Sequence, residues 1–224
     1  MAKVKVPRKS TRIDMTAMSD VTVLLLTFFM LTSTFVKKEP VQVSTPGSVS
    51  EIKIPDSNIM QILIEPNGKV FLSLDKQEDM INALKGVSAR YGIDYAAELD
   101  GNSGKIIGNP ADVKLLNTFK KLSTFGTSIE YMKNFLAKET SEQDKELAKL
   151  GIPTEVDTTI VGGVPRGQFE FWISEARASN KDLRIAIKAD QNTPYKVIKD
   201  VMASLQYLKE NRYNLITSLK QGNQ

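Results

Sequence analysis

The sequence predicts a single membrane-spanning helix near the N-terminus, followed by an α+β domain with a small mixed sheet and helices on one face. The helix is predicted by residues 15–36, the one stretch long and apolar enough to cross a bilayer, with twenty-two residues and one charge. The domain is predicted by strand-like apolar runs towards both ends of the remaining chain, with helical spacing between them. A chain of 224 residues has room for one anchor and one domain of ordinary size.

The single charge in the apolar stretch belongs to Asp20. At ~1.5 Å per residue, Met15–Val36 spans ~33 Å, enough for the ~30 Å hydrocarbon core, whereas Val21–Val36 alone spans ~24 Å and falls short. The length therefore places the carboxyl group in the bilayer or at its edge. Because a carboxylate costs ~2.5–3.5 kcal/mol at mid-depth on insertion scales, we expect Asp20 to serve as an ion or proton relay.

Three threonines lie near Asp20 on one face of the predicted helix: Thr16 one turn before it, and Thr27 and Thr34 at steps of seven residues after it. A polar stripe on one helix should face a partner helix or a water-filled path. The alternative is that the threonine hydroxyl groups bond backbone carbonyls of their own helix. One helix cannot enclose a path, so other subunits would supply the remaining walls.

The positive charge of the chain is concentrated before the span. The net charge is +4, and residues 1–36 contribute +3 of it, from five basic residues against Asp14 and Asp20. This pattern indicates a short basic tail, residues 1–14, and does not predict the basic surface that nucleic-acid binding requires. The five basic residues outweigh Lys37 and Lys38 beyond the span, so the N-terminus is expected in the cytoplasm and the rest outside it.

A cleaved signal peptide is the alternative to an anchor. Its apolar region would have ~7–15 residues and end at an A-x-A-like site. Here the apolar run is longer, contains Asp20 and ends in TSTFVKKEP, so an uncleaved anchor is expected. The absence of cysteine agrees with an oxidising compartment.

The outer part is expected to begin with a linker over residues 37–58, which is rich in proline and serine and contains a short strand-like segment, Glu51–Pro55. An α+β domain over residues 59–224 follows. Its first two runs, Ile59–Glu65 and Val70–Leu74, predict a β-hairpin, because Gly68 supplies the positive φ of a tight turn.

Helical spacing then dominates, including a stretch at about 92–165 that we interpret as a helical insertion beside the sheet. The glycines from Gly101 to Gly108 and Pro110 predict a loop. The predicted helices are Gln77–Tyr91, Ala111–Ala137 with a break at Gly126, Ser141–Leu150 capped by Ser141, and Gln168–Ala178 with the single Trp.

The chain is expected to close with a strand at Leu183–Ala189, a helix from Pro194 to about Glu210, and a strand at Tyr213–Leu219. Asp190 and Tyr195, between the first strand and the helix, could form a site. They could equally be a turn residue and a core aromatic.

Enzyme chemistry has no support in the sequence. There is no His, no Cys and no pair of carboxylates at helical metal-ligand spacing, so neither a metal nor a cofactor is expected. The run Gly162–Gly167 lacks the GxxxxGK[ST] spacing of a phosphate loop and predicts an ordinary loop.

Residues 13–21, IDMTAMSDV, followed by three leucines and Phe29-Met30, resemble the membrane anchor of the ExbD/TolR family. The resemblance assigns the family's proton-carrying Asp to Asp20. Ala17 replaces the expected Pro, and Asp14 stands where Asn is common. Towards the C-terminus, LRIAIKAD at 183–190 followed by Pro194-Tyr195 resembles the end of the family's periplasmic domain.

The resemblance implies an inner-membrane protein that works with an ExbB/TolQ-like membrane protein and drives a TonB- or TolA-like protein with the proton gradient. It also implies a homodimer inside a ring of the ExbB-like partner, with the domain in the periplasm. A TolR-like role in envelope integrity, or a membrane-tethered binding domain with no part in ion flow, are the alternatives. In the last case Asp20 would only pair helices.

Overall fold

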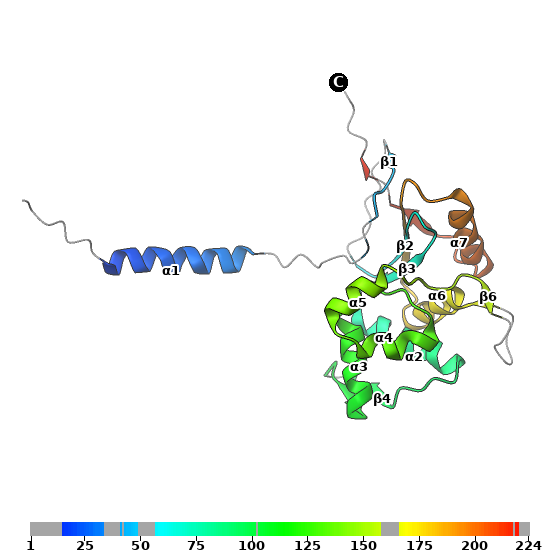
Figure 1. The fold of residues 1–224 in the computed structure, drawn as a ribbon, viewed down its shortest axis with the longest axis horizontal. Coiled ribbons are helices and arrows are strands. Elements are labelled where there is room, and N and C mark those ends of the chain that lie inside the picture. Colours follow the sequence, from blue (N-terminus) through cyan, green and yellow to red (C-terminus); the bar gives the residue numbers. More distant parts are fainter. Residues whose placement is uncertain are drawn as a thin grey trace, which may run out of the picture. The chain divides into compact units, whose positions relative to one another are not determined.

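The computed structural model describes residues 15–33, 41, 43–48, 57–101, 103–157, 166–216 and 218–219. The chain divides into two compact units, residues 1–37 and residues 38–224 (Figure 1). The described residues of the first form a single helix, and those of the second form a mixed domain of strands and helices. The predicted class, an N-terminal apolar helix followed by an α+β domain, is confirmed.

The first unit contains helix α1, Met15–Thr32. Of the described residues, this is the one helix that is long and apolar enough to cross a membrane, with a mean hydropathy of 1.6 over 18 residues. No proline or glycine interrupts it. The helix ends at Thr32, four residues before the predicted end at Val36. Its length of ~27 Å lies close to the ~30 Å of a hydrocarbon core.

The domain is built on a four-stranded mixed sheet with the order β3–β2–β8–β9. The strands are β2 (Ile59–Ile64), β3 (Val70–Leu74), β8 (Arg184–Ala189) and β9 (Tyr213–Leu215). The hairpin β2–β3 is antiparallel as predicted, and Gly68 in its turn has a φ of 83°. The pairs β2–β8 and β8–β9 are parallel, and helix α7 (Tyr195–Tyr207) makes the crossover from β8 to β9.

Helices α2 (Gln77–Arg90), α6 (Gln168–Ser179) and α7 (Tyr195–Tyr207) pack with the sheet around one hydrophobic core. α2 and α6 lie against each other, and Trp172 of α6 is fully buried. These three helices confirm the helical predictions at residues 77–91, 168–178 and 194–210. The alternating pattern of β2 places Met60, Ile62 and Ile64 on one buried face of the sheet.

Residues 92–157 form a small hairpin and three helices. The hairpin strands are β4 (Ala97–Leu99) and β5 (Ile106–Gly108), and β5 falls within the stretch predicted as loop. The predicted helix Ala111–Ala137 is two helices, α3 (Pro110–Lys121) and α4 (Ile129–Ala137), and the break contains Gly126 as predicted. Helix α5 (Thr140–Leu147) follows a cap at Glu139, so the predicted cap at Ser141 is wrong.

The break between α3 and α4 covers the outer edge of β3. The N–H groups of Leu72 and Phe125 donate to each other's carbonyl oxygens at 2.8 and 2.9 Å, and the N–H of Ile152 donates to Val70 O at 2.9 Å. The side chains of Phe119 and Phe125 stack with Trp172, with ring centroids 6.3 and 4.7 Å from the indole. An exposed strand edge is an aggregation hazard, which these contacts remove.

The C-terminal run 213–219, predicted as one strand, is two. β9 extends the main sheet, whereas β10 (Ser218–Leu219) pairs in parallel with β1 (Gly47–Ser48). Within the predicted linker 37–58, Val41 is buried and Val43 packs on the core, so the described part of this segment belongs to the domain. The predicted strand at Glu51–Pro55 lies outside the described residues.

The predicted loop at 162–167 lies outside the described residues except for its last two positions. There Arg166–Gly167 forms strand β7, which pairs with β6 (Val156–Asp157).

Candidate functional site

Asp20 lies in the second turn of α1 and is the only ionisable residue of that helix. Every residue of α1 is exposed in the isolated chain, as expected for a helix whose neighbours are lipid or other subunits. No cationic residue lies on α1, so a partner or water must satisfy the carboxyl group of Asp20 once the helix is inserted.

The hydroxyl groups of Ser19, Thr22, Thr27 and Thr32 on α1 bond the backbone of their own helix. Thr27 Oγ1 donates to Leu24 O at 2.9 Å, and Thr22 Oγ1 lies 2.8 Å from Ser19 O and 3.0 Å from Met18 O. These bonds are the ones that the alternative interpretation of the threonines requires. A hydroxyl that donates in this way keeps acceptor lone pairs, so Thr27 can still accept a hydrogen bond from water or a partner. Thr34 lies outside the described residues.

Asp190, at the end of β8, is buried, with 7% of its surface exposed. Its carboxylate accepts hydrogen bonds from Ser44 N at 2.8 Å and Asn192 N at 2.9 Å. The backbone N–H of Asn192, followed by that of Ser44, lowers the pKa of Asp190 below its usual value. Asp190 therefore shapes a turn and ties the segment around Ser44 to the domain.

Tyr195, the other predicted periplasmic site residue, begins α7 and is 74% exposed. The interpretation of Tyr195 as a core aromatic is therefore wrong, because its side chain, in the first turn of α7, faces solvent. No hydrogen bond joins Asp190 and Tyr195 among the described residues. The structure thus brings together Asp190 and Ser44, a pair that sequence reasoning missed.

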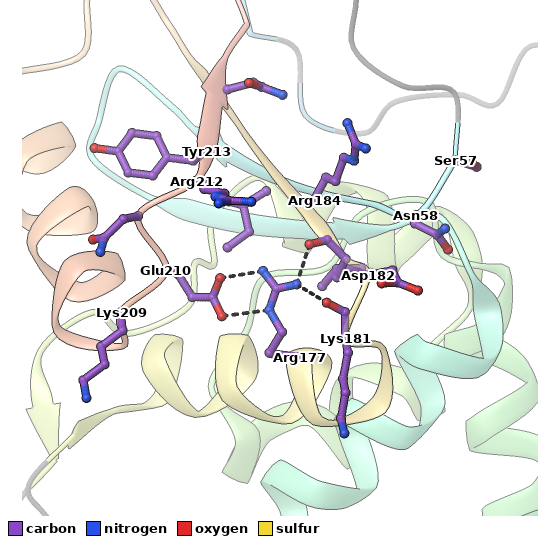
Figure 2. A pocket seen from close by; sticks show the side chains of 14 residues that line it. Ser57, Asn58, Arg177, Lys181, Asp182, Arg184, Lys209, Glu210, Arg212 and Tyr213 are labelled. Atoms are coloured by element: carbon purple, nitrogen blue, oxygen red, sulfur yellow. Dashed lines mark hydrogen bonds and ion pairs between the residues drawn. The ribbon is translucent and has the colours of Figure 1, made fainter.

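Sequence reasoning also missed a polar pocket at the N-terminal ends of β8 and β9 (Figure 2). Its floor is Arg177 of α6, whose guanidinium group donates to both carboxylate oxygens of Glu210 and to the carbonyl oxygens of Lys181 and Leu183. Arg177 and Glu210 lie 33 residues apart in sequence, so no local motif announces the pair. No group of His, Cys, Asp and Glu that could hold a metal ion occurs in the part of the chain that is described.

A comparison with protein families matches residues 7–220 to the model described as "Biopolymer transport protein ExbD/TolR". The chain belongs to the ExbD/TolR family. The match includes α1 with Asp20 and runs through the whole described domain, including residues 92–157. No curated protein and no solved structure matches the chain.

Membership of the ExbD/TolR family makes the chain a component that energises biopolymer transport. ExbD/TolR proteins belong to the inner membrane, and they generally work with ExbB/TolQ and TonB/TolA partners. Helix α1 supplies the apolar segment that such a protein needs.

Proposed function

We propose that this chain is the proton-carrying subunit of an ExbD-like motor and that Asp20 is the group that takes up and releases the proton. The observation that carries the proposal is the single carboxyl group in an otherwise uncharged apolar helix. The family match supports it, because the matched residues include Asp20.

The proposed cycle uses the two charge states of Asp20. The neutral carboxyl group can enter an apolar interface with an ExbB/TolQ-like partner, whereas the carboxylate favours a wetter position or a hydrogen-bond donor. A membrane potential supplies ~2.3 kcal/mol per charge per 100 mV. Alternation between the two positions would move α1 against its partner and couple the proton gradient to mechanical work.

The same proposal assigns the remaining parts. Residues 1–14 lie in the cytoplasm, and the domain lies in the periplasm, where it acts on a TonB- or TolA-like protein. As the family resemblance implies, two copies of the chain share a ring of the partner, and that ring supplies the walls of the ion path that one α1 helix cannot enclose. Thr16, Thr27 and Thr34 form the polar stripe beside Asp20, and the Asp190 turn holds the start of the domain during the transmission of force.

The test is Asp20→Asn in the intact complex, since Asn keeps hydrogen bonding and abolishes titration. We expect membrane insertion and the folded domain to be retained, and gradient-driven uptake of a TonB-dependent substrate to be lost. Asp20→Glu should retain part of the activity at best, because the extra methylene displaces the carboxyl group. Thr22→Val, on another face of α1, is the control and should leave uptake intact.

Two rival functions give different results in this test. A tethered binding domain would keep wild-type activity with Asp20→Asn, which would refute the proton-carrying role. A TolR-like protein would lose envelope integrity, measured as leakage of periplasmic enzymes, while uptake of TonB-dependent substrates continued.

A further inference from the structure

The pocket above Arg177 carries a local excess of positive charge. It has a volume of about 1050 Å³ and is lined by five basic residues against Asp182 and Glu210, a net charge of +3. All of residues 37–224 together have a net charge of only +1, so the pocket has a local excess of positive charge that the domain as a whole does not have. A concave site lined by an excess of charges of one sign attracts ligands of the opposite charge.

One of the two acidic residues is already neutralised. Glu210 receives both of its contacts from Arg177, in a bidentate ion pair that is largely shielded from solvent. Arg177 also donates hydrogen bonds to Lys181 O and Leu183 O. These bonds fix the Arg177–Glu210 ion pair, which forms the floor of the pocket (Figure 2). The cations left to meet a ligand are Lys181, Arg184, Lys209 and Arg212, which are exposed and form no ion pair with a described residue.

Lys209 lies on the wall of this pocket in a backbone conformation that is unusual for lysine. Lys209 has a φ of 61°, a left-handed conformation that favours glycine. It follows α7 in a Schellman turn, in which Glu210 N donates to Leu205 O and Lys209 N to Gln206 O, both at 2.9 Å. Glycine is the usual residue at this position, so a lysine there accepts backbone strain and places a charge on the pocket wall.

The other polar groups distinguish between anionic ligands. Asn211 and Asn214 line the pocket, and their side-chain amides form no hydrogen bond with a described residue. Each amide offers a donor and an acceptor, which match the C=O and N–H groups of a peptide backbone. The exposed carboxylate of Asp182 can accept hydrogen bonds from peptide N–H groups, which a polymer of phosphates does not offer.

We infer that this pocket binds an acidic peptide segment of a partner protein, whose carboxylates pair with Arg184 and Arg212 while Lys181 and Lys209 hold the rim. The planar guanidinium groups match carboxylates bidentately. The volume accommodates several residues of an extended peptide. This inference concerns a site on the domain and does not depend on whether Asp20 carries protons.

The test measures fluorescence anisotropy of a labelled octapeptide that alternates Glu and Thr, with the purified full chain in detergent micelles and no ion gradient. The Glu peptide should bind, its affinity should fall as salt rises, and the matching Gln peptide should not bind. The double variant Arg184→Gln/Arg212→Gln should lose about tenfold or more in affinity. The control Lys196→Gln/Lys199→Gln removes two exposed charges from α7 outside the pocket and should bind like the wild type.

The variant Lys209→Gly tests whether the loss of a pocket cation weakens peptide binding without destabilising the domain. It relieves the left-handed strain, so the melting temperature should rise while affinity for the Glu peptide falls several-fold. Wild-type affinity in Arg184→Gln/Arg212→Gln, equal binding of the Gln peptide, or no binding of the Glu peptide by the wild type would overturn the inference. Inorganic polyphosphate that binds more tightly than the Glu peptide would also overturn it, in favour of a phosphate polymer.

Discussion

Gly126 lies directly against the ring of Phe71, so that a Cβ atom at Gly126 would overlap Phe71 Cδ1 and lie 2.9 and 3.0 Å from two further ring atoms. Phe71 is a fully buried residue of β3. Gly126 is not among the residues with positive φ, so space, and not backbone conformation, requires glycine here. The contact joins the break between α3 and α4 to the sheet.

We predict that Gly126→Ala lowers the free energy of unfolding by ~1–3 kcal/mol, because the added methyl group overpacks a closed part of the core. Urea denaturation of the full chain in detergent measures the change. Gly101→Ala is the matched control, since a Cβ at Gly101 meets no atom within 4 Å and Gly101 has no left-handed φ. Equal losses in the two variants would show that the Phe71 contact is not the cause.

The hydrogen bond between Ser44 N and the Asp190 carboxylate predicts that the unfolding free energy of the domain depends on pH. Backbone donors lower the pKa of Asp190 in the folded state, so its stabilising effect is complete above the usual Asp pKa of ~3.9. That effect is lost as the pH falls through the lowered folded-state pKa. The stability difference between wild type and Asp190→Asn should therefore be constant near neutral pH and shrink under acid conditions.

Hydrogen exchange of residues 43–48 gives a local measurement of the same effect. Asp190→Asn should speed exchange at Ser44 at neutral pH, because a carboxylate acceptor is replaced by a weaker amide. Asp182→Asn is the control, since Asp182 is exposed and its carboxylate forms no bond with Ser44. A difference in unfolding free energy that stays the same at every pH would contradict the assignment to Asp190.

Local patterns were enough to predict the elements whose partners lie nearby in sequence. The hairpin followed from two apolar runs and Gly68, and α2 followed from its apolar spacing. Pairing between distant segments left no such trace, as with Phe125 on the edge of β3 or β10 beside β1. Such pairs depend on tertiary packing, which cannot be inferred from the periodicity of apolar residues or from the residue types found in turns.

The two candidate sites differ in the same way. Asp20 could be predicted because one charge in an apolar run is a property of contiguous sequence. The pocket at Arg177 could not, since its cations come from the ends of α6 and α7 and the starts of β8 and β9. Tyr195 was misjudged because hydrophobic character alone does not decide which side of a first helical turn faces solvent.

The orientation of the anchor gives another prediction. Replacing the basic residues before α1 with Gln should weaken or invert the topology, because Lys37 and Lys38 would then dominate the charge bias. The residues to replace are Lys3, Lys5, Arg8, Lys9 and Arg12. A C-terminal alkaline phosphatase, active only outside the cytoplasm, should be active on the native chain and lose activity in this variant. Lys37→Gln/Lys38→Gln is the control and should keep it active; cytoplasmic location in the native chain would refute the orientation.

Residues 92–165 provide the last prediction. No strand from the described residues of this segment enters the centre of the sheet, which is formed by β2 and β8. The break between α3 and α4, which belongs to this segment, covers the edge of β3. Phe119 and Phe125 form an aromatic cluster with Trp172. Loss of a single buried Phe or Trp side chain costs ~3–5 kcal/mol, and domains have a total stability of only ~5–15 kcal/mol.

Replacing residues 92–165 with a Gly-Ser linker should therefore leave a chain that inserts through α1 but whose domain lacks a cooperative unfolding transition. Near-ultraviolet circular dichroism would show loss of the Trp172 signal, and the exposed β3 edge should promote aggregation. The control shortens only the turn between β4 and β5, residues 100–105, and should unfold cooperatively with a small loss of stability. Cooperative unfolding in the linker variant would mean that the sheet, α2, α6 and α7 are stable alone, and that the contacts of Phe125 with Leu72 and Trp172 add little to the domain.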